Sequence, residues 1–354
     1  MSPWATTKLG FDAVQAALRC ASCGGQQGFD PRTQSLRCES CGQLTEIVAD
    51  PDLDAQREQA FDPGAPEDEP PEIEHAHRCE TCGGEVVFMG QAISEQCPYC
   101  DGSVVLFGGH AHYTPSGLIP MGNTRAEAVE AIVRWVRGLW SAPSRLPKAV
   151  TEGHMAAVYA PFWTFDASKD VNYTVQKRTG QGKSARWIRV SGQVTMVLDD
   201  AVIGASDHVT PDIRDGIMHG FYPQWLKPYQ PEYLAGYAAD LHGRRVSDGL
   251  DKLRRDIEVQ IRRRIRADAG GGRIRNITWT GHLSEIRFRR VLLPLWILHY
   301  HYAGKPYRIV VSGIDGRCFG ERPFSMAKLF GWALLAAGGL FSAGMIIGAG
   351  LAPG

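Results

Sequence analysis

Eight of the nine cysteines of this 354-residue chain stand in four pairs, each with two residues between its members. Fourteen residues separate the first pair from the second, and fourteen again separate the third from the fourth. The paired residues are Cys20, Cys23, Cys38, Cys41, Cys79, Cys82, Cys97 and Cys100. This spacing is typical of zinc ribbons, in which two tight turns aim four thiolates at one metal ion.

A turn of this kind needs a residue that adopts positive φ, and glycine pairs supply it at Gly24-Gly25 and Gly83-Gly84. Four thiolates suit Zn2+ at about 2.3 Å per bond. Because such short hairpins cannot bury a core alone, the metal must supply on the order of 10 kcal/mol of folding free energy per site. We therefore expect two structural zinc ions as the cofactors.

Other uses of these cysteines are open to test. An iron–sulfur cluster also takes four cysteines, whereas a redox pair is disfavoured because all four pairs are matched. Nearby His75, His77, His110 and His112 could replace a cysteine ligand, but the quartets are complete, so we expect them at the surface. A closed four-thiolate shell leaves no coordination position for hydrolysis, so the metal is expected to be structural.

The overall composition is that of an ordinary soluble protein. The formal net charge is zero, 44% of the residues are hydrophobic and 21% are charged. Global charge therefore gives no argument for nucleic acid or membrane binding. The segment from Met1 to Cys20 lacks the basic start and apolar core of a secretory signal, so we expect the N-terminal bulk in the cytosol. In that reducing setting, close cysteines favour metal over disulfide.

The chain divides by composition into five parts. Zinc ribbons are expected over 1–45 and 75–112, with an acidic, proline-rich linker over 46–74 between them. The linker holds eleven acidic residues, one basic residue and five prolines. We interpret it as a solvated spacer, with docking onto a basic partner as the alternative. An α+β domain is expected over 113–322 and a transmembrane helix over 329–351.

The third part mixes helix and strand patterns. Thr124 and Glu127 form a capping box that predicts a helix reaching Trp140. A second helix is predicted from Val246 to Ala267. Its apolar face is Leu250, Leu253, Ile257, Ile261 and Ile265. Strand patterns occupy 158–165, 171–176, 187–198, 273–302 and 307–311. The fold class expected is α+β with a largely antiparallel sheet.

No group of residues in this domain has the types and spacing of a known catalytic site. Asp199-Asp200 is expected in a turn, because adjacent strand residues point to opposite faces. His299 and His301 share one strand face but have no matching ligand pair, and Cys318 is expected to be a free structural thiol. We therefore predict no catalytic residue, no cofactor-binding residue beyond the metal ligands, and no enzymatic activity.

Two features bear on membranes. Arg262, Arg263, Arg264 and Arg266 crowd the end of the second helix. They could bind the phosphates of nucleic acid or of anionic lipid, or form a solvated face that complements the helix dipole. Residues 329–351 carry no charge and follow Arg322 and Lys328. At 1.5 Å per residue this segment spans about 34 Å, enough for a bilayer core of about 30 Å.

The basic flank predicts a single-pass anchor in the cell membrane with the N-terminal bulk in the cytoplasm. Only three residues follow the segment, which is the pattern of a tail anchor. Gly344 and Gly348 form a small-xxx-small pair, so the anchor could associate with another helix, including a second copy of itself. A helix that spans alone and a buried glycine-rich core helix are the alternatives.

An ordered set of motifs carries a family resemblance over most of the chain. After the ribbons come Ala160-Pro161-Phe162-Trp163-Thr164-Phe165-Asp166, Leu198-Asp199-Asp200, Tyr233-Leu234-Ala235-Gly236-Tyr237, Leu292-Leu293-Pro294-Leu295-Trp296, Gly304-Lys305-Pro306-Tyr307 and Gly320-Glu321-Arg322-Pro323. The chain resembles bacterial membrane proteins with a TFIIB-type zinc ribbon, often labelled primosomal-helicase-like. No phosphate-binding Gly-x-x-x-x-Gly-Lys-Ser/Thr loop supports the helicase label.

The resemblance implies a role in membrane-stress modules that contain SPFH-type scaffold proteins and phage-shock-like proteins. Two functions follow as hypotheses: a membrane-anchored adaptor whose ribbons bind cytosolic proteins, or a ribbon protein that binds nucleic acid at the membrane. The second is disfavoured, because the first ribbon is only mildly basic and the second carries Glu80, Glu85 and Glu95.

Overall fold

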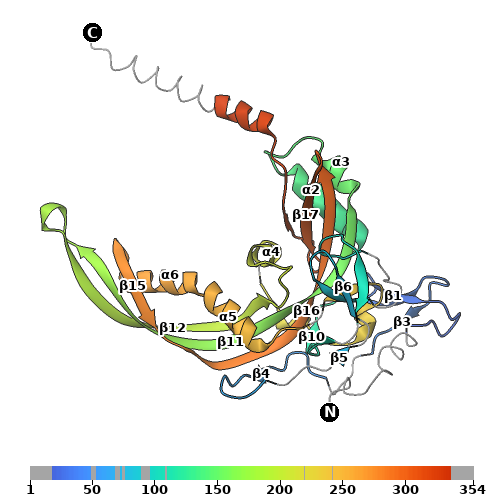
Figure 1. Ribbon diagram of the computed structural model, residues 1–354, viewed down its shortest axis with the longest axis horizontal. Helices are drawn as coiled ribbons and strands as arrows, with labels where there is room; N and C mark the ends of the chain where they lie inside the picture. The colour runs from blue at the N-terminus through green and yellow to red at the C-terminus, as the bar shows by residue number, and fades with distance from the viewer. Residues whose placement is uncertain are drawn as a thin grey trace, which may run out of the picture.

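The computed structural model describes residues 18–48, 53–67, 72–73, 76–88, 96–107, 110–218, 220–240 and 242–335. Within these ranges the chain is a mixed α+β structure (Figure 1). Most of its strand pairs are antiparallel, so the expected fold class is confirmed at this level. The parallel exceptions are β10 with β16 and β11 with β14.

Short strands build the N-terminal part. They are β1 (Gln27–Asp30), β2 (Ser35–Cys38), β3 (Leu44–Thr45), β4 (Gln59–Ala60), β5 (Glu72–Ile73), β6 (Ala76–Cys79), β7 (Glu85–Phe88), β8 (Val104–Phe107), β9 (His110–Ala111) and β10 (Gly117–Leu118). The later strands are β11 (His154–Thr179), β12 (Arg186–Gly204), β13 (Lys227–Pro228), β14 (Ala238–Asp240), β15 (Ile274–Thr280), β16 (Leu283–Tyr302), β17 (Lys305–Ser312) and β18 (Cys318–Gly320).

Thirteen strands of the described residues join into one sheet around β11 and β16. These two long strands pair from His154 opposite His299 to Lys169 opposite Leu283. The outer half of β11 pairs with β12 and β15 instead, and forms a curved arm that extends away from the body (Figure 1). Two strands predicted at 158–165 and 171–176 are thus a single strand, and the strand pattern predicted over 273–302 forms two strands, β15 and β16.

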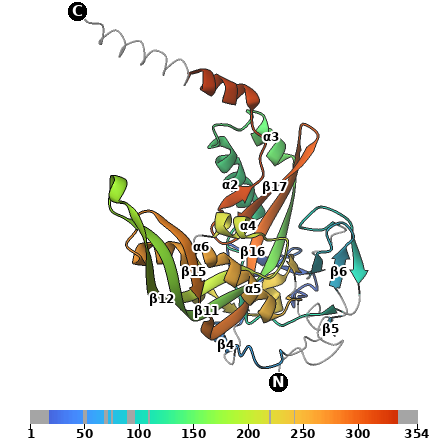
Figure 2. The ribbon, with the colours of Figure 1, turned by 60° about the vertical axis from the view of Figure 1, so that its left-hand side comes forward.

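The α-helices are α2 (Arg125–Arg137), α3 (Leu146–Thr151), α4 (Pro211–Ile217), α5 (Val246–Asp256) and α6 (Glu258–Asp268). The capping box of Thr124 and Glu127 starts α2 as predicted. The helix predicted over 246–267 is divided at Ile257 into α5 and α6. Its five predicted apolar residues are all buried, and they cover one face of the arm (Figure 2).

Part of the acidic segment 46–74, which its composition predicted to be a solvated spacer, is held against the body. Residues 53–67, here called the strap, lie against the sheet. Strand β4 of the strap pairs with Arg287 and Phe288 of β16, and Phe61 packs edge-on against Phe288. Both carboxylate oxygens of Glu67 accept hydrogen bonds from the backbone N–H groups of Val246 and Ser247 at the start of α5. Backbone groups and charges of the strap thus bind partners far away in the sequence, whereas the composition alone predicts that they face water.

The last described residues, 326–335, are helical and project from the body beside α2 and α3 (Figure 1). Ser325 donates its backbone N–H to Ser141 O, and Lys328 Nζ donates to Ala142 O. Among the described residues, no helix is both long and apolar enough to cross a membrane. Most of the predicted span 329–351, with Gly344 and Gly348, lies outside the described residues.

Candidate metal centres

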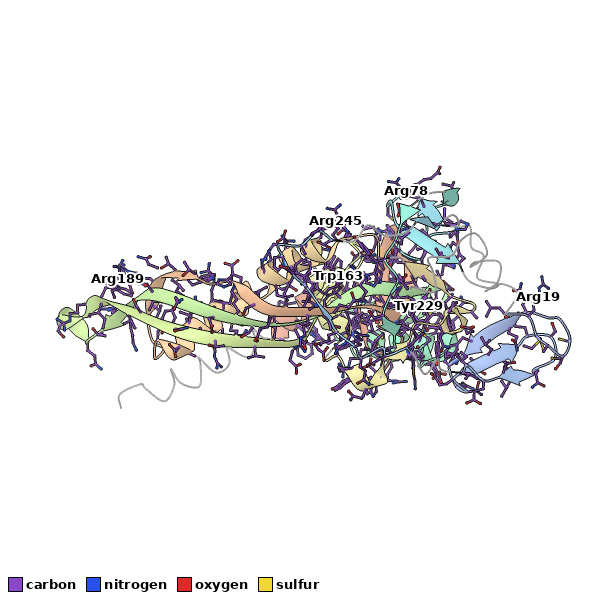
Figure 3. All side chains as sticks on the ribbon, turned by 90° about the horizontal axis from the view of Figure 1, so that it is seen from below. Arg19, Arg78, Trp163, Arg189, Tyr229 and Arg245 are labelled. Atoms are coloured by element: carbon purple, nitrogen blue, oxygen red, sulfur yellow. The ribbon has the colours of Figure 1, made fainter. Side chains whose placement is uncertain are left out.

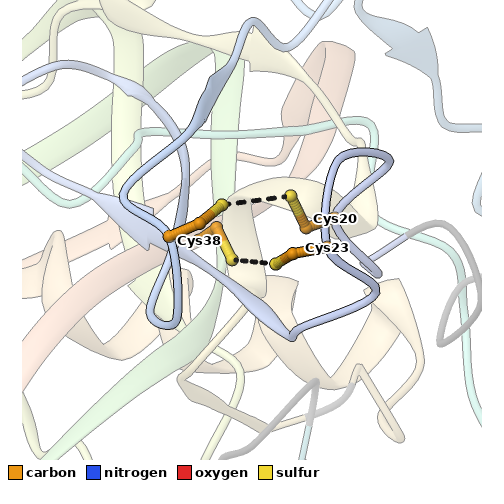
Figure 4. Close-up of side chains that lie close together, drawn as sticks. Cys20, Cys23 and Cys38 are labelled. Carbon is orange, nitrogen blue, oxygen red and sulfur yellow. Dashed lines mark hydrogen bonds between the residues drawn. The ribbon is translucent and has the colours of Figure 1, made fainter.

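The first four cysteines meet at one end of the sheet formed by β1, β2 and β3. The Sγ atoms of Cys20 and Cys41 are 3.7 Å apart, and those of Cys23 and Cys38 are 3.5 Å apart (Figure 4). A tetrahedron with metal–sulfur bonds of about 2.3 Å has edges of about 3.8 Å, so the quartet has the size that a zinc ion requires. Gly24, with φ of +72°, directly follows the second ligand and closes this turn by donating its backbone N–H to Cys20 O.

The second four cysteines repeat this arrangement. The Sγ atoms of Cys79 and Cys100 lie 3.4 Å apart, and those of Cys82 and Cys97 lie 3.7 Å apart. Gly83 has the same φ of +72° as its counterpart in the first quartet. The structure therefore gathers the eight cysteines into the two groups that their spacing suggested, and each group could hold a metal ion. None of the nine cysteines is in a disulfide.

Backbone N–H groups prepare some of these thiols for metal binding. Hydrogen bonds from the backbone, first that of Cys41, lower the pKa of Cys38 to about 6. At Cys79 burial raises the pKa, but the backbone N–H groups of Cys82 and Thr81 outweigh it and lower the pKa to about 7. Burial raises the pKa of Cys82 to about 12. Four thiolates this close repel one another, so a divalent cation is what lets all four ionise together.

The two sites differ in how deeply they are set into the molecule. Cys23 and Cys41 are exposed, whereas Cys97 is completely buried and Cys82 is half-buried. The first ribbon contacts the body through Phe29, which packs edge-on against Tyr233 and Tyr237, and through the buried Leu18 and Leu36. Its three strands form a separate small sheet, so the first site is a peripheral unit.

The second ribbon belongs to the large sheet, because β7 pairs with β14. Inside its second cysteine turn, Tyr99 is 1% exposed and donates its hydroxyl to Asp240 at 2.7 Å. His208 stacks on Tyr99 with ring centroids 4.4 Å apart, and its Nε2 lies 4.0 Å from Cys82 Sγ. Local sequence patterns could not predict these contacts, because the partners stand more than 100 residues further along the chain.

The structure places the remaining predicted residues away from a shared site. His112 is buried, with Nε2 3.7 Å from a carboxylate oxygen of Glu85, so its expected surface position is wrong. His77 packs edge-on against Phe88. His75 and the side chain of His110 lie outside the described residues.

His299, Cys318 and Arg262 do not meet at one site, and each makes its own contacts. His299 Nε2 lies 3.0 Å from Pro98 O, so this sheet histidine is hydrogen-bonded to the backbone next to the second site. Cys318 is half-buried, and burial raises the pKa of its thiol to about 12, as suits a structural cysteine. Arg262 forms an ion pair with Glu258 and lies over the ring of Trp279.

Sequence reasoning missed a third group of ionisable residues. Glu58 of the strap, Asp166 and Asp200 bring carboxylate oxygens within 4.8 Å of one another. Arg289 lies among them, with Nη2 2.9 Å from Glu58 and Nη1 2.5 Å from Asp200. Asp166 marks register shifts of β11 against both neighbours, and its carboxylate accepts the backbone N–H of Asp200.

This arrangement corrects the turn expected at Asp199-Asp200. Asp200 stays within β12 but adopts φ of +49°, which turns its carboxylate toward Arg289. Burial raises the pKa values of Glu58 and Asp200, and Arg289 acts in the opposite direction on both. We assign no metal to this group, because the buried guanidinium of Arg289 already lies among its carboxylates. The group instead holds the strap against the sheet.

The chain is similar to a curated bacterial protein. The chain is 24% identical over 241 residues to an uncharacterized protein, YdjG, of Bacillus subtilis (strain 168), over 66% of this chain and 70% of that protein. No family model matches the chain, and no solved structure matches it.

Proposed function

We propose that this protein is a membrane-anchored adaptor whose two zinc ribbons are rigid docking units for cytosolic proteins, with no enzymatic activity. The main support for this proposal is the pair of four-cysteine groups, whose Sγ–Sγ distances fit a closed tetrahedral shell around a metal ion. Such a shell leaves no position for a substrate. Zinc, rather than iron, is the proposed metal at both sites.

The surface of the first ribbon supports a docking role. Leu44 is 46% exposed and Val48 is 77% exposed beside the exposed cysteines of that ribbon. Exposed apolar side chains on a rigid hairpin are suited to protein partners. The resemblance makes SPFH-type or phage-shock-like proteins the partner class to test first.

Membrane anchoring through 329–351 is the second part of the proposal. The described start of this segment exposes large apolar side chains, with Phe330 at 63%, Trp332 at 59% and Leu334 at 73%. Trp332 packs edge-on against Trp140, which is itself 59% exposed. Aromatic side chains of this kind favour the membrane–water interface. The proposed location is the cell membrane, single-pass, with the bulk of the chain in the cytoplasm.

Capture from native membranes tests the adaptor role. We expect Leu44→Glu to reduce recovery of bound proteins about tenfold, since a buried charge at a small interface costs on the order of 1–2 kcal/mol. Val259→Glu is the matched control, because Val259 is 64% exposed on α6, outside both ribbons. Equal recovery with both variants would contradict docking at the first ribbon. Salt-sensitive recovery of nucleic acid instead would favour the alternative function.

Alkaline carbonate extraction tests the anchor. Leu340→Arg with Phe341→Arg places two charges at the middle of 329–351, each costing about 2.5–3.5 kcal/mol to insert. We expect the full chain to stay in the membrane pellet and this variant to be extracted. Val259→Arg, at a surface residue that is 64% exposed, is the control that should stay in the pellet. Full extraction of the unaltered chain would refute the anchor.

A further inference from the structure

The arm is a feature that the proposed adaptor role does not use. The outer parts of β11 and β12 run side by side to the turn near residue 182, and β15 pairs with the other edge of β11. Helices α5 and α6 cover one face of the arm, and no helix of the described residues lies over the other face (Figure 2). Arg189 lies toward its outer end (Figure 3).

The arm is basic in sequence. Residues 171–198 and 269–284 together hold seven basic residues and no acidic residue. The seven are Lys177, Arg178, Lys183, Arg186, Arg189, Arg273 and Arg275. No ion pair to a described carboxylate is formed by Arg178, Arg186 or Arg189. This concentration of charge stands out in a chain with zero net charge.

Strand register places part of this charge on the open face. Tyr173 and Val175 are buried on the side of α6, and Tyr173 donates its hydroxyl to Asp268 of that helix. Because side chains alternate along a strand, Gln176 and Arg178 lie on the opposite face.

The neighbouring strands extend that open face. Gln176 is opposite Arg189 on one side and opposite Arg275 on the other, while Arg178 is opposite Trp187. The open face near the end of the arm therefore carries three arginines around one tryptophan. We call Arg178, Trp187, Arg189 and Arg275 the arm tip.

The tryptophan of the arm tip is amphipathic and accessible. Trp187 is 39% exposed, and the guanidinium of Arg275 lies 4.0 Å from its ring centroid. A Trp with flanking arginines suits the headgroup layer of a bilayer, where the ring lies at the interface and the charges meet lipid phosphates.

We propose that the arm tip docks onto the surface of an anionic lipid bilayer. Charge complementarity favours an anionic bilayer as the partner, since each Arg near an anionic leaflet strengthens binding by a factor of about five. In Figures 1 and 2 the arm extends to the left of the body, and the helix 326–335, with its exposed apolar side chains, leaves the upper end of the body and inclines toward that side. The inference rests on the proposed membrane anchoring and adds a second contact with the same membrane.

Nucleic acid fits the arm tip less well. Single-stranded nucleic acid is bound by a groove that combines basic residues with several stacking aromatics. The arm tip has one tryptophan, one face of which is covered by Arg275, on the outer end of a projecting hairpin. A convex basic end with a single aromatic matches a broad charged surface better than a strand of bases.

Hydrogen exchange of the full chain tests the proposal. The chain is placed in nanodiscs of phosphatidylcholine, with or without phosphatidylglycerol, and exchange is read in peptides covering 178–190. We expect exchange about tenfold slower in anionic discs only, and reversed by high salt. The variant Arg178→Gln, Arg189→Gln, Arg275→Gln should lose this protection, while unchanged exchange of β16 shows that it is folded.

The matched control is Arg263→Gln, Arg264→Gln, Arg266→Gln, which removes the same charge from α6 and should keep the protection. Equal exchange in both kinds of disc overturns the inference and leaves the anchor intact. If the chain does not stay in neutral discs, the anchor fails, and added anionic vesicles alone then decide whether the arm tip is protected. Stronger protection by an oligonucleotide than by anionic lipid overturns the lipid assignment.

Discussion

Cys97→Ser is expected to remove one of two zinc ions per chain and to unfold the second ribbon together with the adjoining end of the large sheet. Cys97 is fully buried, and removing one thiolate leaves three that repel one another. A structural zinc supplies about 10–16 kcal/mol of folding free energy. A whole domain is usually stable by only about 5–15 kcal/mol, so the loss cannot be absorbed.

The sheet transmits this damage because the second ribbon is part of it. Strand β7 pairs with β14, and β14 pairs in parallel with Val158 and Tyr159 of β11. The hydrogen bond from Tyr99 to Asp240 of β14 crosses the same boundary. Without the metal, the turn that holds Tyr99 loses its shape and the buried Asp240 carboxylate loses a donor.

Cys41→Ser should behave differently although it removes the same kind of ligand. Cys41 is exposed, and its ribbon is a separate three-stranded sheet. We expect one zinc per chain and a local loss of the first ribbon, with the main thermal transition close to that of the unaltered protein. Metal content by mass spectrometry and thermal unfolding distinguish the two outcomes.

Cys318→Ser is the matched control, because this thiol lies outside both quartets and should leave two zinc ions bound. Similar unfolding transitions for Cys97→Ser and Cys41→Ser would show that the second metal does not hold the sheet. Two iron atoms or a visible charge-transfer band in the purified chain would instead favour a cluster.

The parts of the structure that could be predicted from the sequence are those fixed by neighbours in the chain. Cysteine spacing and Gly24 define one turn within a few residues, and Thr124 with Glu127 defines the start of α2. The buried apolar face from Leu250 to Ile265 could be predicted because helical periodicity is a local pattern. The break at Ile257 was not, since both halves keep the same buried face.

The strap shows why the rest could not be predicted. Its composition resembles a disordered linker, yet Arg289 donates to Gln56 O across 233 residues of sequence. Glu58 gains a partner only because β11 and β16 bring Arg289 to the same place. The Asp166–Asp200–Arg289 contacts likewise depend on a register shift in β11 that no periodic pattern announces.

Arg289→Met is expected to release the strap at neutral pH and to destabilise the protein by about 3 kcal/mol, the usual cost of leaving a buried charge unpaired. The Arg289 side chain is 8% exposed and those of Glu58 and Asp200 are 15% and 16% exposed. The variant therefore leaves Glu58 and Asp200, with Asp166 close to both, without the buried cation that pairs with them. Urea unfolding gives the global change, and trypsin cleavage after the exposed Arg57 reports opening of the strap.

The pH dependence follows from the direction of the pKa shifts. Burial raises the pKa values of Glu58 and Asp200, so the folded state holds these protons more tightly than the unfolded state. The resulting penalty is absent below the ordinary pKa of a carboxyl and appears as the pH rises through the raised values. Removing Arg289 raises them further, so the variant should lose less stability at about pH 4.5 than at about pH 7.

Arg287→Met separates this mechanism from a general loss of charge. Arg287 approaches the same Glu58 at 3.8 Å, but its side chain is 65% exposed, so its removal should cost about 0.5 kcal/mol or less. Adding Asp166→Asn to Arg289→Met removes one of the three carboxylates and should restore part of the stability at neutral pH. An equal loss from both arginine variants, or a loss from Arg289→Met that does not change with pH, would show that the strap is held by its strand pairing and apolar contacts instead.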